Sequence, residues 1–331
     1  MNKTLEMPML YKRLSKAGLP PKFIQEKALP EWWDAELENN PVAVLEAAGR
    51  IAKRLGLDMA SVLDPDAPIT FKQIIRPKFK KIQKNSDESR LIVAQGLATR
   101  VAEMVTYACK RPFTDMATNA FEIRNFILKN NSYIDLDAIV RFCWNCGIPV
   151  VHFSEFPRGS IKMDGMAAVI NDRPVIVLSS NRRYSAYLLF IILHEIGHIA
   201  SGHVKDCVLI DEKIIKEAED KEEQEANEFA EVILFGEKNK YAWAKISDSI
   251  QLTRMVRQLG NKDAVDPGAL ALNYAWQAEQ KQDWAIAQGA LKIIEPVANA
   301  SVKINSYLQK ELNWEKLDTD SEEYLKLVTG V

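Results

Sequence analysis

Three of the four histidines of the chain lie within ten residues of one another, at His194, His198 and His203. His194 and His198 are four residues apart, and Glu195 directly follows the first of them. On a helix this spacing places both imidazoles on one face, where they can bind one ion, and Glu195 can reach a water molecule without being a ligand. Two imidazoles, one further ligand and an open water position are the arrangement of catalytic zinc. The spacing therefore predicts a catalytic metal site.

The residues around this motif favour the same interpretation. The run from Tyr187 to Ala200 is apolar apart from the motif itself, which predicts a helix that is buried on most sides. A buried ionisable group is costly unless it is paired or bound to a metal. The alternative is an amphipathic helix that contains these letters by chance, and the apolar context favours the metal.

A third ligand is expected from a second helix, about 25 residues further on. The segment Glu222–Ala230 has no glycine or proline and has apolar residues at helical spacing. Glu223 and Asn227 share a face there, so that a carboxylate can complete the metal site and an amide can hydrogen-bond to a ligating histidine. Glu225 is the main rival ligand, because residues 211–231 are rich in charge and most of them must face solvent.

Together the two segments resemble the ImmA/IrrE family of metallo-endopeptidases, over roughly residues 130 to 240. The family pattern is His-Glu-x-Gly-His on an apolar helix, followed by Glu-x-x-Ala-Asn-x-Phe-Ala, which here begins at Glu223. The resemblance implies that His194, His198 and Glu223 bind zinc and that Glu195 is the general base. The family is similar to gluzincins, whose third ligand opens a Glu-x-x-x-Asp/Asn pattern, and this selects Glu223 over Glu225. The chain departs from the family at Ile233–Gly236, where a leucine-rich turn and a proline are usual.

Residues near the motif have further candidate roles. Zinc lowers the pKa of a bound water from about 15.7 to about 7, and Glu195 would take the proton and pass it to the leaving amine. Arg182, Arg183 and Tyr184 precede the metal helix; Tyr184 is a candidate catalytic residue that stabilises the oxyanion, although all three can equally be surface residues of a loop. His203 is expected at the rim of the site or in contact with substrate, rather than as a ligand.

The predicted fold class is α+β and predominantly helical, with a small mixed sheet packed on the zinc-binding helix and helical regions at both ends. Residues 148–153 read as a short strand, and residues 166–170 and 175–179 read as the arms of a hairpin. Such a sheet can offer an edge to an extended peptide substrate. A purely structural hairpin is the alternative.

Four regions are expected along the chain: an N-terminal helical region (1–70), a helical linker or bracing segment (71–130), the zinc peptidase core (131–240) and a C-terminal helical region (241–331). Ala47–Leu57 looks like the first helix and turn of a helix-turn-helix, but the helix that follows is poor in base-reading residues. A helical hairpin that packs or recruits a partner is at least as good an interpretation. The basic run Arg76–Lys84 is interpreted as a solvated linker, with phosphate contact as the alternative. The end, Asp318–Val331, is expected to be frayed or a docking tail.

Bulk properties limit the class of protein. The 331 residues carry a formal net charge of −2, so no global basic field points to nucleic acid. The polar start, Met1–Pro20, predicts no signal peptide, and no apolar run is long enough for a membrane span. Four cysteines fit a reduced, cytoplasmic protein. Cys143 and Cys146 form a lone CxxC at the end of an apolar helix, where buried thiols are ordinary.

Two functions follow as hypotheses. The first is a cytoplasmic zinc endopeptidase that cleaves one specific protein; the resemblance implies a helix-turn-helix repressor encoded nearby, so that cleavage acts as a regulatory switch, often in a stress response. The second is a DNA- or protein-binding regulator, or a toxin–antitoxin component, in which the zinc fold is a scaffold. Glu195 favours the first, because a scaffold has no use for a general base.

Overall fold

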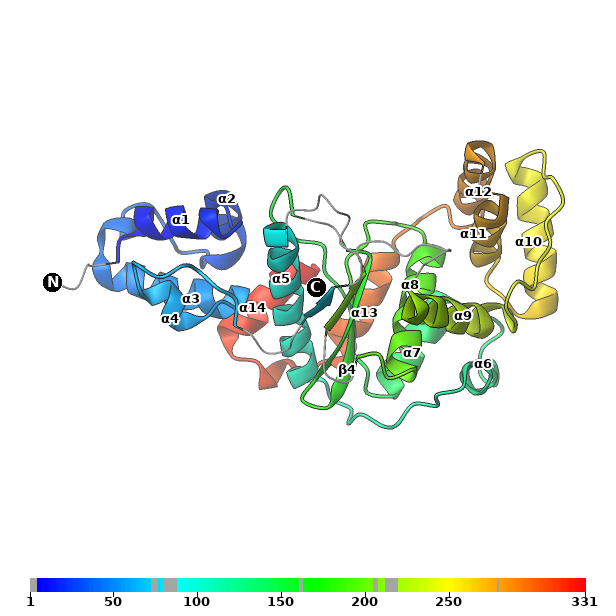
Figure 1. Cartoon of the computed structure of the whole chain (residues 1–331), viewed down its shortest axis with the longest axis horizontal. Helices are drawn as coiled ribbons and strands as arrows, with labels where there is room; N and C mark the ends of the chain where they lie inside the picture. Colours follow the sequence, from blue (N-terminus) through cyan, green and yellow to red (C-terminus); the bar gives the residue numbers. More distant parts are fainter. Residues whose placement is uncertain are drawn as a thin grey trace.

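The computed structural model describes residues 5–72, 77–79, 88–160, 163–204, 208–211, 220–278 and 280–331. The molecule is elongated, with the N-terminal helices at one end, helices α10 to α12 at the other, and a sheet with its flanking helices between them (Figure 1). The buried apolar residues nevertheless form one large cluster that runs from Met7 to Val328. The helical regions at both ends therefore share a core with the centre of the molecule.

The sheet has five strands in the order β1-β5-β3-β4-β2 and is mixed. Its strands are β1 (Pro77–Phe79), β2 (Val150–His152), β3 (Gly165–Ile170), β4 (Arg173–Leu178) and β5 (Val208–Asp211). The sheet lies between α5 on one side and α7, α8 and α13 on the other (Figure 1). This arrangement confirms the predicted class, a predominantly helical α+β fold with a small mixed sheet against the helix that carries the histidines.

The hairpin predicted before that helix is present as β3 and β4. Its two-residue turn is formed by Asn171 and Asp172, both with positive φ (50° and 61°), which matches the right-handed twist of the strands and suits these residue types. However, β3 also pairs with β5, and β4 also pairs with β2. Both arms of the hairpin therefore lie inside the sheet, whose edge strands among the described residues are β1 and β2, and a sheet edge that binds a peptide stays a prediction.

Helices make up most of the described chain. The N-terminal region contains α1 (Met7–Lys16), α2 (Pro21–Phe23), a π-helical turn η1 (Ile24–Ala28), a 3-10 turn η2 (Leu37–Asn39), α3 (Pro41–Leu55) and α4 (Met59–Leu63). The centre contains α5 (Glu88–Ala108), α6 (Ala120–Leu128), α7 (Leu136–Asn145), α8 (Ser185–Ala200) and α9 (Lys221–Phe235). The C-terminal region contains α10 (Ser249–Asp263), α11 (Pro267–Ala278), α12 (Lys281–Ile294), α13 (Ala300–Glu311), a 3-10 turn η3 (Trp314–Lys316) and α14 (Thr319–Thr329).

The last segment of the chain is a packed helix and not a frayed end. In α14, Tyr324, Leu325 and Val328 are buried, and the helix lies between α3 and α5. The segment thus docks inside the molecule, because its apolar face completes the core beneath the N-terminal helices.

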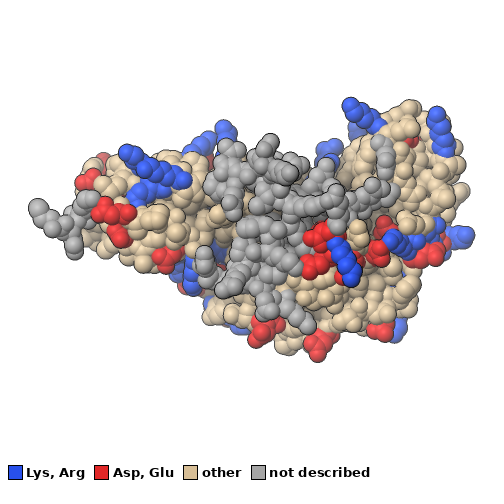
Figure 2. All heavy atoms as spheres, in the orientation of Figure 1, with Lys and Arg blue, Asp and Glu red and all other residues tan. Residues whose placement is uncertain are grey.

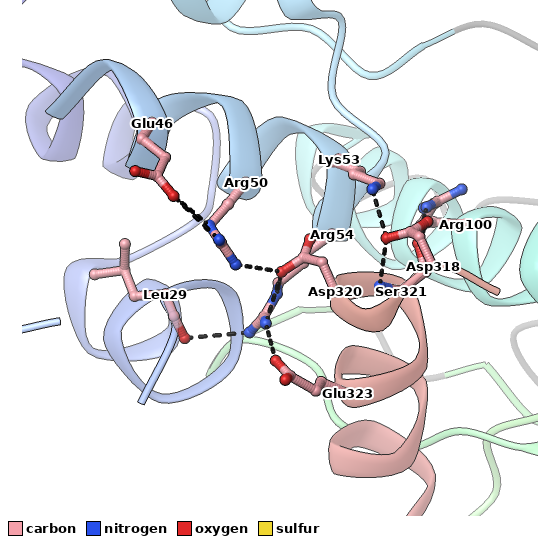
Figure 3. Close-up of polar contacts among 10 residues, drawn as sticks. All are labelled: Leu29, Glu46, Arg50, Lys53, Arg54, Arg100, Asp318, Asp320, Ser321 and Glu323. Carbon is pink, nitrogen blue, oxygen red and sulfur yellow. Dashed lines mark hydrogen bonds and ion pairs between the residues drawn. The ribbon is translucent and has the colours of Figure 1, made fainter. Parts of the chain in front are cut away.

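Helix α3 is joined to α14 by an ion-pair cluster, here called the α3–α14 cluster (Figure 3). Arg54, which is only 3% exposed, donates from Nε to Asp320 Oδ1 (2.8 Å) and from Nη2 to Glu323 Oε2 (3.1 Å). Its Nη1 donates to the carbonyl of Leu29 (3.2 Å), and Lys53 Nζ lies 2.6 Å from Asp318 Oδ1. The basic side chains of α3 are therefore committed to acidic partners within the molecule.

The packing of α3 against α14 is relevant to the helix-turn-helix considered for Ala47–Leu57. The turn after α3 is present, with Gly56 in the left-handed region (φ 69°), but α4 has only five residues. On the face in Figure 2, the part of the surface over the N-terminal helices carries acidic as well as basic side chains. Both observations favour the alternative of a helical hairpin that packs. Of the basic run Arg76–Lys84, Pro77–Phe79 forms strand β1, and the rest lies outside the described residues.

No described helix combines the length and the continuous apolar character needed to cross a lipid bilayer.

Candidate metal centre

Helix α8 holds the motif in the interior. His194, Glu195 and His198 are each 0% exposed, because α8 packs against β3 and β4, against α7 and α9, and against α11. The start of α8 is capped from the C-terminal region: Ser185 donates from its backbone N (2.8 Å) and from Oγ (2.7 Å) to the carboxylate of Glu295. An acceptor with negative charge is favourable at this end of a helix. The helix is thus fixed at its start and on most of its sides.

Helix α9 approaches α8 closely at the motif. A Cβ on Gly197 would lie 2.9 Å from Ala226 Cα and 3.0 Å from the Ala226 carbonyl oxygen. Only a residue without a side chain fits there, so the glycine of the motif is what lets α9 lie against the two histidines. At the far end of α9, the buried Arg124 donates to the carbonyls of Ile233 and Leu234 (both 2.7 Å) and so satisfies the end of that helix.

The structure brings His194, His198 and Glu223 together. His194 Nε2 lies 3.0 Å from His198 Nε2 and 3.3 Å from Glu223 Oε2, and His198 Nε2 lies 3.4 Å from Glu223 Oε1. An ion with tetrahedral bonds of about 2.0–2.1 Å separates its ligand atoms by roughly 3.3 Å. The triangle therefore has the donor types and the spacing of a three-residue zinc site. It is the one such group of three or more metal-binding side chains within the described parts of the chain.

Other side chains orient the two imidazoles. His194 Nδ1 lies 2.9 Å from Asn227 Oδ1, so this nitrogen carries the proton and Nε2 is left to bind. This is the contact that the sequence predicts for Asn227. On the other ring, His198 Nδ1 lies 2.9 Å from His203 Nδ1, and His203 Nε2 lies 3.1 Å from Glu225 Oε2.

These contacts separate the two rival glutamates. Glu223 reaches both histidines, whereas Glu225 contacts His203 and Lys221 Nζ (3.3 Å) at the rim. Burial raises the pKa of the Glu223 carboxyl, but hydrogen bonds and attraction from His194 and His198 outweigh it and hold that pKa well below its usual value. Glu223 is therefore an anion, which is the form that binds a metal ion.

Glu195 lies against the first residue of β3. A Cβ on Gly165 would lie 2.2 Å from Glu195 Oε1 and 2.9 Å from Ile191 Cγ2. The glycine therefore makes the space that the Glu195 carboxylate occupies between helix and sheet. A second glycine outside the motif thus shapes the site, and nothing in the linear pattern distinguishes Gly165 from the other glycines.

Arg182, Arg183 and Tyr184 lie before the first turn of α8, at the opposite end of this helix from His198. Tyr184 precedes the first residue of α8, about 15 Å of helix rise before His194. Its hydroxyl accepts from Arg183 Nη2 (3.5 Å), whose guanidinium lies over the ring. Arg182 lies over the ring of Tyr187, 4.9 Å from its centroid. The structure does not bring Tyr184 to the triangle of metal-binding atoms, because the helix separates them.

Among the described residues, Cys143 and Cys146 belong to no group of three or more metal-binding side chains. Cys143 is fully buried at the end of α7, and burial raises the pKa of its thiol. A buried thiol held in the neutral form is inert as a ligand and as a nucleophile.

Two contacts of the site were not anticipated from sequence: the hydrogen bond between His198 and His203, and the role of Glu225 as the partner of His203. The only sequence signal for the first was the closeness of His203 to the motif, five residues after His198. The turn Ser201–Val204 after α8 folds His203 back toward the helix, and that fold cannot be read from spacing alone.

Comparison with curated proteins and with solved structures found no match for this chain. A family model does match: residues 148–258 correspond to Peptidase_M78, the IrrE N-terminal-like domain. The matched segment spans β2 to α10 and contains every residue of the triangle. The segment that is similar to the IrrE N-terminal-like domain is therefore about a third of the chain and includes both histidines, Glu195 and Glu223, in agreement with the resemblance to ImmA/IrrE proteins.

Proposed function

We propose that this protein is a zinc-dependent endopeptidase that hydrolyses a peptide bond in one specific intracellular protein. The observation that carries the proposal is the geometry of α8 and α9: the metal-binding side chains His194, His198 and Glu223 approach one another to 3.0–3.4 Å, and the carboxylate of Glu195 is buried on α8 beside the two histidines. The match to a peptidase family supports the reaction class.

In this proposal, each residue has a distinct task. His194, His198 and Glu223 would hold the metal. A zinc ion in that position supplies Lewis-acid activation of water and of the scissile carbonyl. Glu195 accepts the proton of the attacking water on its carboxylate and delivers it to the leaving amine. Asn227 and His203 keep the two imidazoles in the orientation that binding requires.

We further propose that the substrate is a helix-turn-helix repressor and that cleavage acts as a regulatory switch. The resemblance to ImmA/IrrE proteins supports this substrate class. The helical regions outside the matched domain support selectivity, since one of their helices, α11, packs against α8. A binding role without catalysis is the second candidate; the buried general base disfavours it.

The test uses the full-length protein loaded with zinc. It is incubated with the products of neighbouring genes, repressors first, with and without a chelator, and cleavage is read on a gel and by mass spectrometry. Glu195→Gln is expected to keep a full complement of zinc and to lose cleavage. Glu228→Gln serves as the matched control, because Glu228 is an exposed glutamate on α9, and it should cleave like wild type.

Two results would contradict the proposal. One is the absence of stoichiometric transition metal in carefully purified protein. The other is a Glu195→Gln variant with the same behaviour as wild type in every assay, which would favour the binding role.

A further inference from the structure

A cavity of about 590 Å³ lies beside the metal site, between the first half of α8 and helices α11 and α12. This volume is within the range of ligand-binding pockets in proteins. Its walls are mainly apolar and aromatic. The side chains that define it are Tyr187, Phe190, Ile191, Leu272, Trp276 and Trp284.

The aromatic wall is held in place by specific contacts. Phe190 and Trp276 meet edge to face, with ring centroids 4.6 Å apart. The hydroxyl of Tyr187 accepts a hydrogen bond from Gln288 Nε2, and Asn273 Oδ1 accepts from Trp243 Nε1 (2.8 Å). These bonds occupy the Tyr187 hydroxyl and the Asn273 amide oxygen, two of the polar groups of the wall.

The cavity wall comes within one helical turn of Glu195 in the sequence of α8. Ile191 lines the cavity and precedes Glu195 by one helical turn, and both side chains flank Gly165. Asp164, the neighbour of Gly165, also lines the cavity. Along α8, Ile191 and Tyr187 precede His194 by about 5 and 10 Å of helix rise. An extended chain advances about 3.3–3.6 Å per residue, so these rises along α8 correspond to about one to three residues of a substrate that runs parallel to the helix.

Much of the wall comes from outside the matched family domain. Ala269, Leu272, Trp276 and Trp284 follow residue 258, where the match ends, and belong to the C-terminal helices. The helices that follow the matched domain therefore help to shape the cavity, whose wall includes Ile191, one helical turn before Glu195.

We propose that this cavity is the specificity pocket of the enzyme and that it receives a large apolar side chain, preferentially aromatic, of the substrate polypeptide. The inference rests on the proposed endopeptidase function and adds its substrate class. The C-terminal helices thus select which peptide bond is cut, because a chain without a large apolar residue near the scissile bond leaves an apolar cavity unfilled.

The experiment uses the full-length, zinc-loaded protein and a peptide library prepared from a proteome digest, with cleavage sites read by mass spectrometry. We expect large apolar residues to be enriched at one fixed position within three residues of the cleaved bond. Trp276→Ala should lower kcat/KM about tenfold or more for peptides that carry such a residue, and much less for peptides with alanine at that position. Trp276→Phe should restore most of the preference, which a loss of folding would not allow.

Trp314→Ala is the matched control, because Trp314 is also a partly buried tryptophan but belongs to η3, outside the cavity. It is expected to retain the wild-type profile. Cleavage without an apolar preference, or a preference that Trp276→Ala leaves intact, would overturn the inference and leave the proposed function standing. No cleavage of any peptide by a zinc-loaded preparation would count against the proposed function itself.

A small aromatic ligand is the other conceivable occupant. N-acetyl-tryptophanamide is therefore titrated into wild type, Trp276→Ala and Trp314→Ala. Binding that requires Trp276 and competes with peptide cleavage supports the inference. Binding that requires Trp276 but leaves cleavage unchanged would identify an effector site and overturn it.

Discussion

Two polar clusters join helices that are distant in sequence, and they differ in what they contain. The α3–α14 cluster combines cations and anions: Arg54 lies between Asp320 and Glu323, and Lys53 contacts Asp318 (Figure 3). The cluster between α8 and α9 consists of His194, His198 and Glu223, and its atoms nearest one another are nitrogens and carboxylate oxygens that can act as metal ligands.

This difference distinguishes a cluster that can stabilise the fold by itself from a cluster whose atoms are suited to binding a metal ion. In the α3–α14 cluster the protein itself supplies both charges, so the cluster can stabilise the fold without any added component. In the α8–α9 cluster the converging donor atoms are suited to a cation from outside. The first cluster should therefore respond to mutation through stability alone, and the second through metal binding and activity.

Removal of the metal should give the largest change. A zinc ion present at about 1,000 times its Kd stabilises the folded protein by about 4 kcal/mol, so a chelator should lower the free energy of unfolding by that amount. Glu223→Gln should abolish most of this metal-dependent difference, as measured by denaturant titration with and without zinc. Equal stability of wild type with and without zinc would contradict the assignment of α8 and α9 as a metal site.

Arg54→Ala should give the second-largest change, a loss of folding stability. The side chain is nearly fully buried, and its loss leaves Asp320, which is itself largely buried, without its main cation. Breaking a buried pair typically costs about 3–5 kcal/mol, and the exposed position of Glu323 places this case at the lower end. The free energy of unfolding is the measurement, and zinc affinity is expected to stay unchanged. A fall in zinc affinity would mean that the two clusters are coupled.

His203→Ala should have an intermediate effect that is confined to the metal. Loss of a residue that orients a ligating histidine typically lowers metal affinity by about 10- to 100-fold. Chelator competition is the measurement. Tyr133→Phe, far from α8 in sequence and on the exposed surface, is the control. Unaltered affinity in His203→Ala would show that His198 needs no such support.

Lys53→Ala should change little. The Lys53–Asp318 pair is about half exposed on both sides (44% and 52%), and exposed pairs contribute about 0–1 kcal/mol. A loss as large as that of Arg54→Ala would refute the distinction between the buried and exposed parts of the α3–α14 cluster.

The smallest expected effect is the change in stability at acid pH that depends on the Lys53–Asp318 pair. Burial raises the pKa of Asp318, but hydrogen bonds from Lys53 and Ser321 outweigh it and lower that pKa to about 2, below the ordinary 3.8. The contribution of Asp318 to stability is therefore fully present above about pH 4 and is lost as the pH falls toward about 2. Unfolding curves between pH 5 and pH 2 should show a smaller acid loss for Lys53→Ala than for wild type. Identical slopes would contradict the assigned cause.

Much of the fold could be predicted from local pattern. The β3–β4 hairpin follows from two β-branched arms around Asn171 and Asp172, and α8 to α12 follow from apolar residues at helical spacing. Strands β1 and β5 were missed, because each has only three or four residues and lies in a stretch dominated by charge. The pairing of β5 with β3 makes both hairpin strands internal to the sheet, and a sheet edge that binds a peptide stays a prediction. The four predicted regional boundaries stay predictions.

What the sequence determined by itself is the chemistry near α8. The four-residue spacing of His194 and His198, the adjacent Glu195, and the pattern that begins at Glu223 are local features, and helix geometry converts the four-residue spacing into a shared face. Only the tertiary structure decided how close Glu223 comes to the two histidines, because the distance between α8 and α9 depends on Gly197. It also decided the space for the Glu195 carboxylate, which depends on Gly165 in strand β3. It also decided the wall of the adjoining cavity, since residues after 258 reach α8 only through the packing of α11 and α12, which no local pattern encodes.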